Sequence, residues 1–390
     1  MRLLSKSNLS AIVFAILLCG FLYFSYFPLI FQINPELVLY GQLFFVALLL
    51  LYICFFSSAR TYQALLLLFL IVCTLIVLSL FPLLNSRAAY DMGKFYKFFL
   101  MLLFSSATGA YLLQEKNKIL FIQILSYWSL ILSALILVLN WGNLDANRFG
   151  QGIGNPIWIA RMSGVYVIYA SFKYINRHLN AIEACFAVFA LSLMILTESR
   201  GPILSLAIVW AAFSIIQKGR ISKKLGSAVA LVIISIAAFL LLSDSIKARF
   251  YEVFDFENSI RYLLYSLAIG LIIKNPLGWG AGGFEAQTKI SDGLTYPHNL
   301  VLELLVEFGI LFSIFFIFII LLSWLRGVYL FRTEGRTSPN GFFAALLMYG
   351  FINSMFSGDM TSPKEVYILT FYFLASYWRA NLLRHASHAI

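Results

Sequence analysis

The sequence predicts an all-α protein, a polytopic membrane helical bundle of about twelve transmembrane helices with one long external loop that contains short helices. Apolar residues make up 61% of the 390 residues and charged residues only 12%, and the mean hydropathy is +0.88. A soluble domain carries about 25% charged residues, so this chain has too little polar surface to cover a water-facing fold. A bilayer removes the difficulty, because hydrocarbon solvates an apolar helical exterior.

Apolar runs of about 20 residues give the positions of the spans. The first run follows Arg2 and Lys6, and it is too long for the apolar region of a signal peptide, so we expect it to be the first span. The expected helices lie near 11–32, 36–56, 62–82, 98–113, 119–139, 157–173, 181–197, 201–217, 225–242, 299–324, 341–357 and 365–380.

These spans divide the chain into three parts: nine helices in 1–242, the external loop in 243–298, and three helices in 299–390. Within the loop, Asp244–Ser259 has apolar residues at near-helical spacing with charges between them, which predicts an interfacial helix. The apolar stretch Tyr262–Ile273 is too short to span, so we expect it to lie in the interface or to pack re-entrantly.

Charged residues predict the sidedness of the bundle. Most Lys and Arg residues fall in one alternate set of loops, and most acidic residues fall in the other set, which includes the long loop. The positive-inside rule therefore places both termini in the cytoplasm and the long loop outside, in the periplasm of a Gram-negative cell. The net charge of +11 does not indicate nucleic-acid binding, because the basic residues are scattered among short loops.

The four cysteines all lie inside apolar runs. They are Cys19, Cys54, Cys73 and Cys185, and no pairing partner lies in a loop. We expect them to be small core residues, and neither disulfides nor metal ligands.

Two arginines on the predicted outer side are candidates for binding a diphosphate. Arg200 lies between two spans, and Arg261 begins the short apolar stretch of the long loop. Guanidinium is permanently charged and offers a planar fork of donors that fits phosphate oxygens. The alternative is that each arginine pairs locally, Arg200 with Glu198 and Arg261 with Glu257. Arg148 and Arg161, before and within the 157–173 helix, are possible supporting residues.

His298 is the only one of the four histidines outside the predicted cytoplasmic loops. With an ordinary pKa near 6.5, it can accept a proton from a sugar hydroxyl at neutral pH. Pro297 fixes the turn before it, and Asn299 or Glu303 could orient the ring. The alternative is a structural histidine. A metal site is not expected, because no second histidine or cysteine ligand lies on that side.

The stretch Gly278–Gly283 formally contains the G-x-G-x-x-G pattern of dinucleotide-binding proteins. It follows Asn275-Pro276 and no strand, so we do not expect it to bind a dinucleotide. We expect a flexible loop that lets the backbone approach a substrate or fold tightly.

Together these fragments resemble the bacterial O-antigen ligase and polymerase superfamily of membrane glycosyltransferases. The matching residues, in chain order, are Arg148, Gly150, Asn155-Pro156, Ser199-Arg200-Gly201, Arg261, Pro276, Gly278, Gly280, Phe284, His298-Asn299, Leu302, Glu307 and Gly309. The resemblance implies a metal-independent, inverting transfer of glycan from an undecaprenyl-diphosphate donor in the bacterial inner (cytoplasmic) membrane, with no cofactor. It assigns Arg200 and Arg261 to the donor diphosphate and His298 to activation of the acceptor hydroxyl.

The resemblance leaves the acceptor open. A polymerase adds glycan to another lipid-linked unit, whereas a ligase transfers it to lipid A–core. The outer turn Ser357-Gly358-Asp359 looks similar to turns in polymerases, which slightly favours the first. Partners are therefore the lipid-linked glycan, the glycan or lipid A–core acceptor, the lipid bilayer and, as a further possibility, other polysaccharide-assembly proteins, with no nucleic acid.

Two hypotheses from other classes compete with the enzyme. A transporter or flippase of lipid-linked sugars would carry charges near the bilayer midplane in several spans, whereas the predicted spans are nearly free of charge apart from Arg161. For a sensor or scaffold without chemistry the sequence offers no positive sign.

Overall fold

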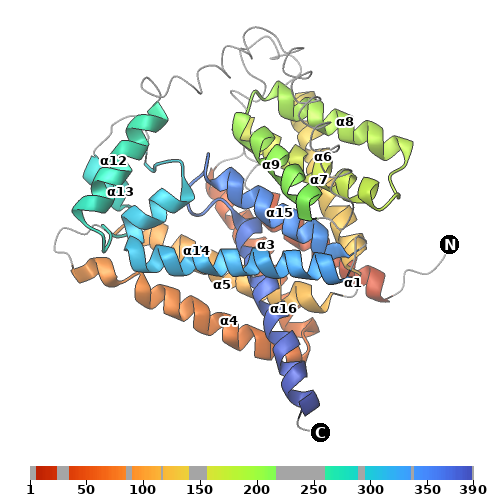
Figure 1. The fold of residues 1–390 in the computed structure, drawn as a ribbon, viewed down its shortest axis with the longest axis horizontal. Coiled ribbons are helices and arrows are strands. Elements are labelled where there is room, and N and C mark those ends of the chain that lie inside the picture. The colour runs from red at the N-terminus through yellow and green to blue at the C-terminus, as the bar shows by residue number, and fades with distance from the viewer. Residues whose placement is uncertain are drawn as a thin grey trace.

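The structure is a computed structural model that describes residues 6–23, 35–84, 90–115, 117–139, 156–216, 260–288, 295–334 and 338–388. All regular structure in these ranges is helical (Figure 1). The helices are α1 Lys6–Tyr23, α3 Pro35–Phe56, α4 Ala59–Leu78, η2 Phe81–Leu84, α5 Met92–Gln114, α6 Lys118–Leu139, α7 Pro156–Ile175, α8 Ala181–Leu196, α9 Arg200–Ile216, α12 Ile260–Lys274, α13 Gly283–Thr288, α14 Leu300–Glu334, α15 Pro339–Ser354 and α16 Lys364–His388.

Four of the described helical stretches are long and apolar enough to cross a membrane, and several shorter apolar helices accompany them. The four are Thr61–Leu84, Met92–Gln114, Lys118–Leu139 and Leu300–Glu334. Large apolar side chains such as Phe55 and Leu66 point outward, 80% and 64% exposed. An apolar exterior around a packed helical interior confirms the predicted class, a polytopic helical membrane protein.

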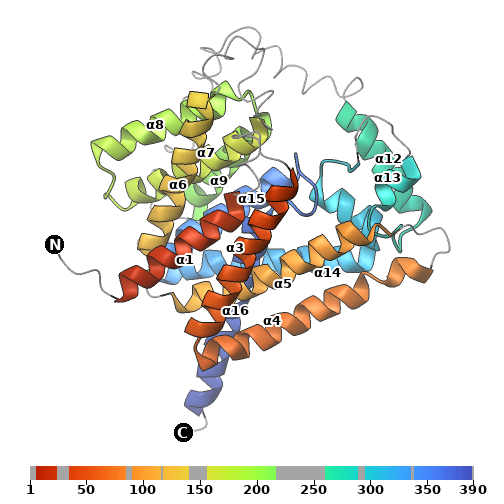
Figure 2. The ribbon, with the colours of Figure 1, turned by 180° about the vertical axis from the view of Figure 1, so that it is seen from behind.

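The helices pack around α14, α5 and α16. Helix α5 lies along α16 and α4, and α14 packs against both α15 and α16. Figures 1 and 2 show α15 between the group α7, α8 and α9 on one side and the pair α12 and α13 on the other. This arrangement brings chain segments distant in sequence to one end of α15, where it turns into α16.

Helix α5 begins six residues earlier than the predicted span near 98–113. Asp91 caps it, since its carboxylate accepts hydrogen bonds from the backbone N–H groups of Gly93 (2.8 Å) and Lys94 (3.2 Å). The cap places Lys94 inside a helix. The predicted span 225–242 and the predicted interfacial helix Asp244–Ser259 lie outside the described residues.

The expectation that every cysteine is a core residue is wrong for two of them. Cys19 is buried and Cys73 is half-buried, whereas Cys54 and Cys185 lie on the outer surface of the bundle. An apolar run does not distinguish the core side of a membrane helix from the lipid side, because both are apolar. All four thiols are free.

Helix α14 is kinked at Gly309, whose φ is 81° and ψ is 177°. The residues 275–283, which we call the glycine loop, complete the hydrogen bonding of the kink. Trp279 N–H donates to the Val306 carbonyl (2.8 Å) and Gly280 N–H to the Glu307 carbonyl (2.8 Å), while Ile310 N–H donates to Pro276 (2.9 Å). The glycines therefore serve close backbone packing, the second of the two roles expected for this stretch.

Candidate functional site

His298 lies in the short segment that leads into α14. Its backbone has a φ of 55°, a left-handed conformation between Pro297 and Asn299. The half-buried imidazole packs against the Tyr296 ring, with centroids 4.4 Å apart and planes tilted by 58°. Strained backbone at a polar, half-buried histidine is typical of functional sites.

Charged groups from two other elements act on His298. Burial lowers the pKa of the imidazole, the nearby Arg261 guanidinium lowers it further, and Asp359 partly offsets both by raising it. The net direction is down, so the ring is neutral at neutral pH and its lone pair is available to a proton. The structure thus brings His298 and Arg261, two of the predicted site residues, within electrostatic reach of each other.

Arg261 lies in the first turn of α12 and is exposed. The rest of that helix is anchored by buried Leu264, Ala268 and Leu271, and by Tyr265, whose hydroxyl donates to the Met355 carbonyl (3.3 Å). At 15 residues the helix is too short to span, as the sequence predicted. The guanidinium is therefore presented from a fixed helix at the edge of the bundle.

Arg200 is the first residue of α9 and is half-buried. The chain reverses just before it, where Glu198 has a φ of 51° and Thr197 accepts from the Ser199 N–H through its hydroxyl (3.3 Å). A Cβ on Gly201 would lie 3.1 Å from the Cβ of Phe356, so the start of α9 packs closely against the turn after α15.

Arg161 is buried in α7, with 8% of its surface exposed. Its Nη2 donates to the carbonyls of Asn353 (2.8 Å) and Ser357 (2.7 Å), and Nη1 faces Gly358. The guanidinium thereby ties α7 to the end of α15 and neutralises the carbonyls at that end. A supporting role toward a substrate stays a prediction, and Arg148 lies outside the described residues.

The α15–α16 connection, residues 355–363, is where these elements converge. It contacts the start of α9 through Phe356, α7 through Ser357 and α12 through Met355. Asp359 holds the turn by accepting from Thr361 N–H (3.1 Å) and from the Ser362 hydroxyl (2.6 Å). One short connection thus fixes the helices that carry Arg161, Arg200 and Arg261, and its carboxylate acts on His298.

Asn299 and Glu303 have partners of their own. The Asn299 side chain caps α14 by accepting from Val301 (3.0 Å) and Leu302 (3.1 Å) N–H, and it donates to the Met355 carbonyl (3.2 Å). Glu303 is fully buried and forms an ion pair with Lys94. That either residue orients the imidazole stays a prediction.

The sequence analysis did not predict one buried charged cluster. Lys94 Nζ lies 2.7 Å from Glu303 Oε1 and 2.5 Å from Glu307 Oε1, and both carboxylates have no exposed surface. The statement that the spans are nearly free of charge apart from Arg161 is therefore wrong. The signal in the sequence was the spacing of Glu303 and Glu307, because residues four positions apart lie on one face of a helix. Both also lie in an apolar run, where a charged residue indicates function.

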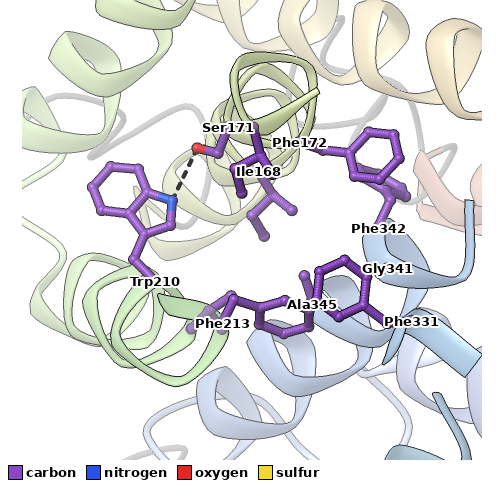
Figure 3. A pocket seen from close by; sticks show the side chains of 11 residues that line it. Ile168, Ser171, Phe172, Trp210, Phe213, Phe331, Gly341, Phe342 and Ala345 are labelled. Atoms are coloured by element: carbon purple, nitrogen blue, oxygen red, sulfur yellow. Dashed lines mark hydrogen bonds between the residues drawn. The ribbon is translucent and has the colours of Figure 1, made fainter. Parts of the chain in front are cut away.

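An apolar cavity of about 40 Å³ lies elsewhere, among α7, α9, α14 and α15 (Figure 3). Phe172, Phe213 and Phe331 line it, and its polar contact is the hydrogen bond from Trp210 Nε1 to Ser171 Oγ (2.9 Å). None of its lining residues is charged, so it does not provide the charge compensation that a diphosphate requires.

Fold and site together define a polytopic α-helical membrane protein in which α7, α9 and α12, each carrying an arginine, contact one inter-helix connection, whose Asp359 acts on the half-buried His298. Residues 185–317 match the protein family described as O-antigen ligase. This range contains Arg200, Arg261 and His298, and the match confirms the resemblance to the O-antigen ligase and polymerase superfamily. No curated protein matches the chain.

Proposed function

We propose that the chain is a membrane glycosyltransferase that moves a glycan from an undecaprenyl-diphosphate donor to a sugar hydroxyl at the periplasmic face, with both termini in the cytoplasm. The observation that carries the proposal is a half-buried, neutral imidazole at His298 beside the Arg261 guanidinium. The helix that begins with Arg200 packs on the same α15–α16 connection. A base beside one cation, with a second cation on a helix that packs on the same connection, suits the transfer of a group from a diphosphate.

In this reaction the acceptor hydroxyl gives its proton to the imidazole of His298 as its oxygen attacks the anomeric carbon of the donor sugar. The bond from that carbon to the diphosphate oxygen breaks with inversion, and undecaprenyl diphosphate leaves. Arg200 and Arg261 balance the negative charge that develops on the leaving group. No nucleotide is required, because the donor already carries a good leaving group, and the charge compensation by arginines makes the transfer metal-independent.

For the acceptor we favour a second lipid-linked unit, which makes the protein a polymerase of O-antigen or exopolysaccharide. The similarity of the Ser357-Gly358-Asp359 turn to those of polymerases supports this choice. The alternative acceptor is lipid A–core, which makes the protein a ligase with the same donor chemistry. Deletion of the gene separates the two: single-unit caps on the core indicate a polymerase, whereas uncapped core with accumulated lipid-linked polymer indicates a ligase.

The arginines are tested with purified protein in detergent, supplied with donor and acceptor. Arg200→Lys and Arg261→Lys are each expected to lower turnover roughly 100-fold, because an ammonium cannot reproduce the forked contact. Arg332→Lys is the matched control, since Arg332 is exposed at the far end of α14. Near-normal turnover of both test variants would remove the arginines from the mechanism.

The same assay tests His298 and the transporter alternative. His298→Ala is expected to abolish most turnover while the affinity for a labelled donor stays largely intact, because a base acts in the chemical step. Loss of donor binding with unchanged turnover of bound donor would make His298 structural. Product formation in detergent, with no second compartment, is expected for an enzyme and excludes a protein that only transports.

A further inference from the structure

The buried cluster of Lys94, Glu303 and Glu307 lies at the junction of α5 and α14 and has no part in the mechanism so far. Two carboxylates and one ammonium are enclosed together, and the Lys94 side chain is 15% exposed. Without its cation the cluster would enclose two neighbouring carboxyl groups with no positive partner, and burying an ionised carboxylate unpaired is strongly unfavourable in a low-dielectric interior. Lys94 is therefore needed to keep both glutamate side chains buried at these positions.

The cluster is connected to His298 through the first turn of α14. Glu303 N–H donates to the Asn299 carbonyl (2.9 Å), and Asn299 directly follows His298. The side chain of the same glutamate is held by Lys94. Glu303 and Lys94 also act electrostatically on Tyr296, the ring against which the imidazole packs. Fixing Glu303 thus fixes the turn that presents the histidine.

Glu307, the second glutamate, lies two residues before the kink of α14 and is held through both its backbone and its side chain. The Glu307 carbonyl accepts from Gly280 N–H (2.8 Å) in the glycine loop, and the Glu307 side chain accepts from Lys94 Nζ (2.5 Å). The N-cap of α5 is tied to the same loop, because Asp91 N–H donates to the Ala281 carbonyl (2.7 Å). Lys94 consequently joins the start of α5 to the part of α14 that precedes the kink.

We infer that Lys94 is a positioning residue for the reaction: by pairing with Glu303 and Glu307 it holds the start of α14, and with it His298, in the orientation needed for proton transfer. Lys94 lies outside the matched range 185–317, so the amino-terminal helices contribute to the site. The inference rests on the proposed function, because turnover is one of its readouts.

The test is a double-mutant cycle in purified protein. Lys94→Met is expected to lower kcat roughly 100-fold, because a displacement of about 1 Å at a reacting centre has an effect of that size. The KM for the donor is expected to change less than about threefold, because the proposed diphosphate contacts lie elsewhere. Lys94→Arg keeps the charge and is expected to recover most of the loss. Lys97→Met is the matched control, since Lys97 is exposed on the same helix.

Glu303→Gln distinguishes charge balance from direct contact with substrate. Alone it leaves Lys94 paired with Glu307 and keeps a side-chain oxygen that can accept from Lys94, so it is expected to lower kcat much less than Lys94→Met does. Combined with Lys94→Met it removes one of the two buried carboxyl groups left without a cation, so the double variant is expected to be more active and to melt at a higher temperature than Lys94→Met. A double variant no better than Lys94→Met, or a Glu303→Gln variant as inactive as Lys94→Met, would overturn the inference.

Failure of this inference and failure of the proposed function are separable. Thermal unfolding of the four members of the cycle reports charge balance whatever reaction the protein catalyses. If His298→Ala and the two arginine variants keep normal turnover, the proposed function fails. If those variants are inactive while Lys94→Met stays fully active, only the positioning role of Lys94 fails.

Discussion

Replacement of Gly309 by alanine tests the junction that carries the site. Gly309 has a φ of 81° and ψ of 177°, a combination that essentially only glycine adopts, and imposing it on another residue costs about 1–3 kcal/mol. A Cβ at this position would also lie 2.9 Å from the Pro276 carbonyl oxygen and closer still to the Leu277 carbonyl. Overpacking of this kind costs about 1–3 kcal/mol more. We therefore expect Gly309→Ala to destabilise the fold by about 2–6 kcal/mol.

The matched control is Gly270→Ala. Gly270 lies within α12, and a Cβ there would have no heavy atom within 4 Å. Alanine in a helix interior is more stable than glycine by about 0.5–1 kcal/mol, so this variant is expected to be neutral or slightly stabilised. Both variants add one methyl group to the same part of the protein, and only the backbone conformation and the space around it differ.

The assay is unfolding in mixed micelles, followed by tryptophan fluorescence and by glycan synthesis after the same treatment. Trp279, one of seven tryptophans, is buried beside the kink with its Nε1 donating to the Leu271 carbonyl (2.9 Å), so part of the fluorescence change comes from the junction. Gly309→Ala should unfold at milder conditions than the parent and should synthesise less glycan, because the kink directs the first turns of α14. A Gly309→Ala variant as stable as Gly270→Ala would refute the reasoning.

The remaining predictions concern pH and one further ion pair. Because the pKa of His298 is lowered from 6.5, the neutral base persists below that pH, and kcat/KM should fall only as the pH drops through the lowered value. Asp359→Asn removes the carboxylate that raises this pKa, so the acid limb of the kcat/KM profile should move to lower pH; a move to higher pH would contradict the assignment. Lys173 lies 2.5 Å from Glu183, with 17% and 6% of the side chains exposed, and Lys173→Met should lower the free energy of unfolding by roughly 2–3 kcal/mol by leaving a buried carboxylate unpaired. Adding Glu183→Gln should restore most of that loss in the unfolding assay, and no recovery would show that the pair is not the cause.

Apolar runs predicted most described helices within a few residues, because hydrocarbon thickness and the 1.5 Å rise of a helix fix the length of a span. The span near 181–197 corresponds to α8 Ala181–Leu196, and the span near 36–56 to α3 Pro35–Phe56. The prediction was short at the carboxyl ends of α14 and α16 and at the start of α5. At α5 the reason is a polar cap: the Asp91 carboxylate accepts hydrogen bonds from two backbone N–H groups, which extends the helix through residues that hydropathy does not select.

The candidate site was predictable in its residue types and not in its connections. Arg200, Arg261 and His298 were selected because permanent charge and a near-neutral pKa are costly in a membrane protein unless they are used. Sequence spacing did not indicate that Asp359 would act on His298, or that Arg161 would be held by carbonyls of α15. Those contacts join residues that lie 61 and 192 positions apart in the sequence.

The sequence by itself determined the class of protein and the approximate positions of its helices, and it suggested a chemistry for three polar side chains, because each of these follows from local composition. Only the tertiary structure decided that the glycine loop closes the kink of α14, and that Lys94 is enclosed with Glu303 and Glu307. The reason is that a hydrogen bond or an ion pair between distant segments depends on how helices pack, and apolar helix faces of similar composition do not specify their neighbours.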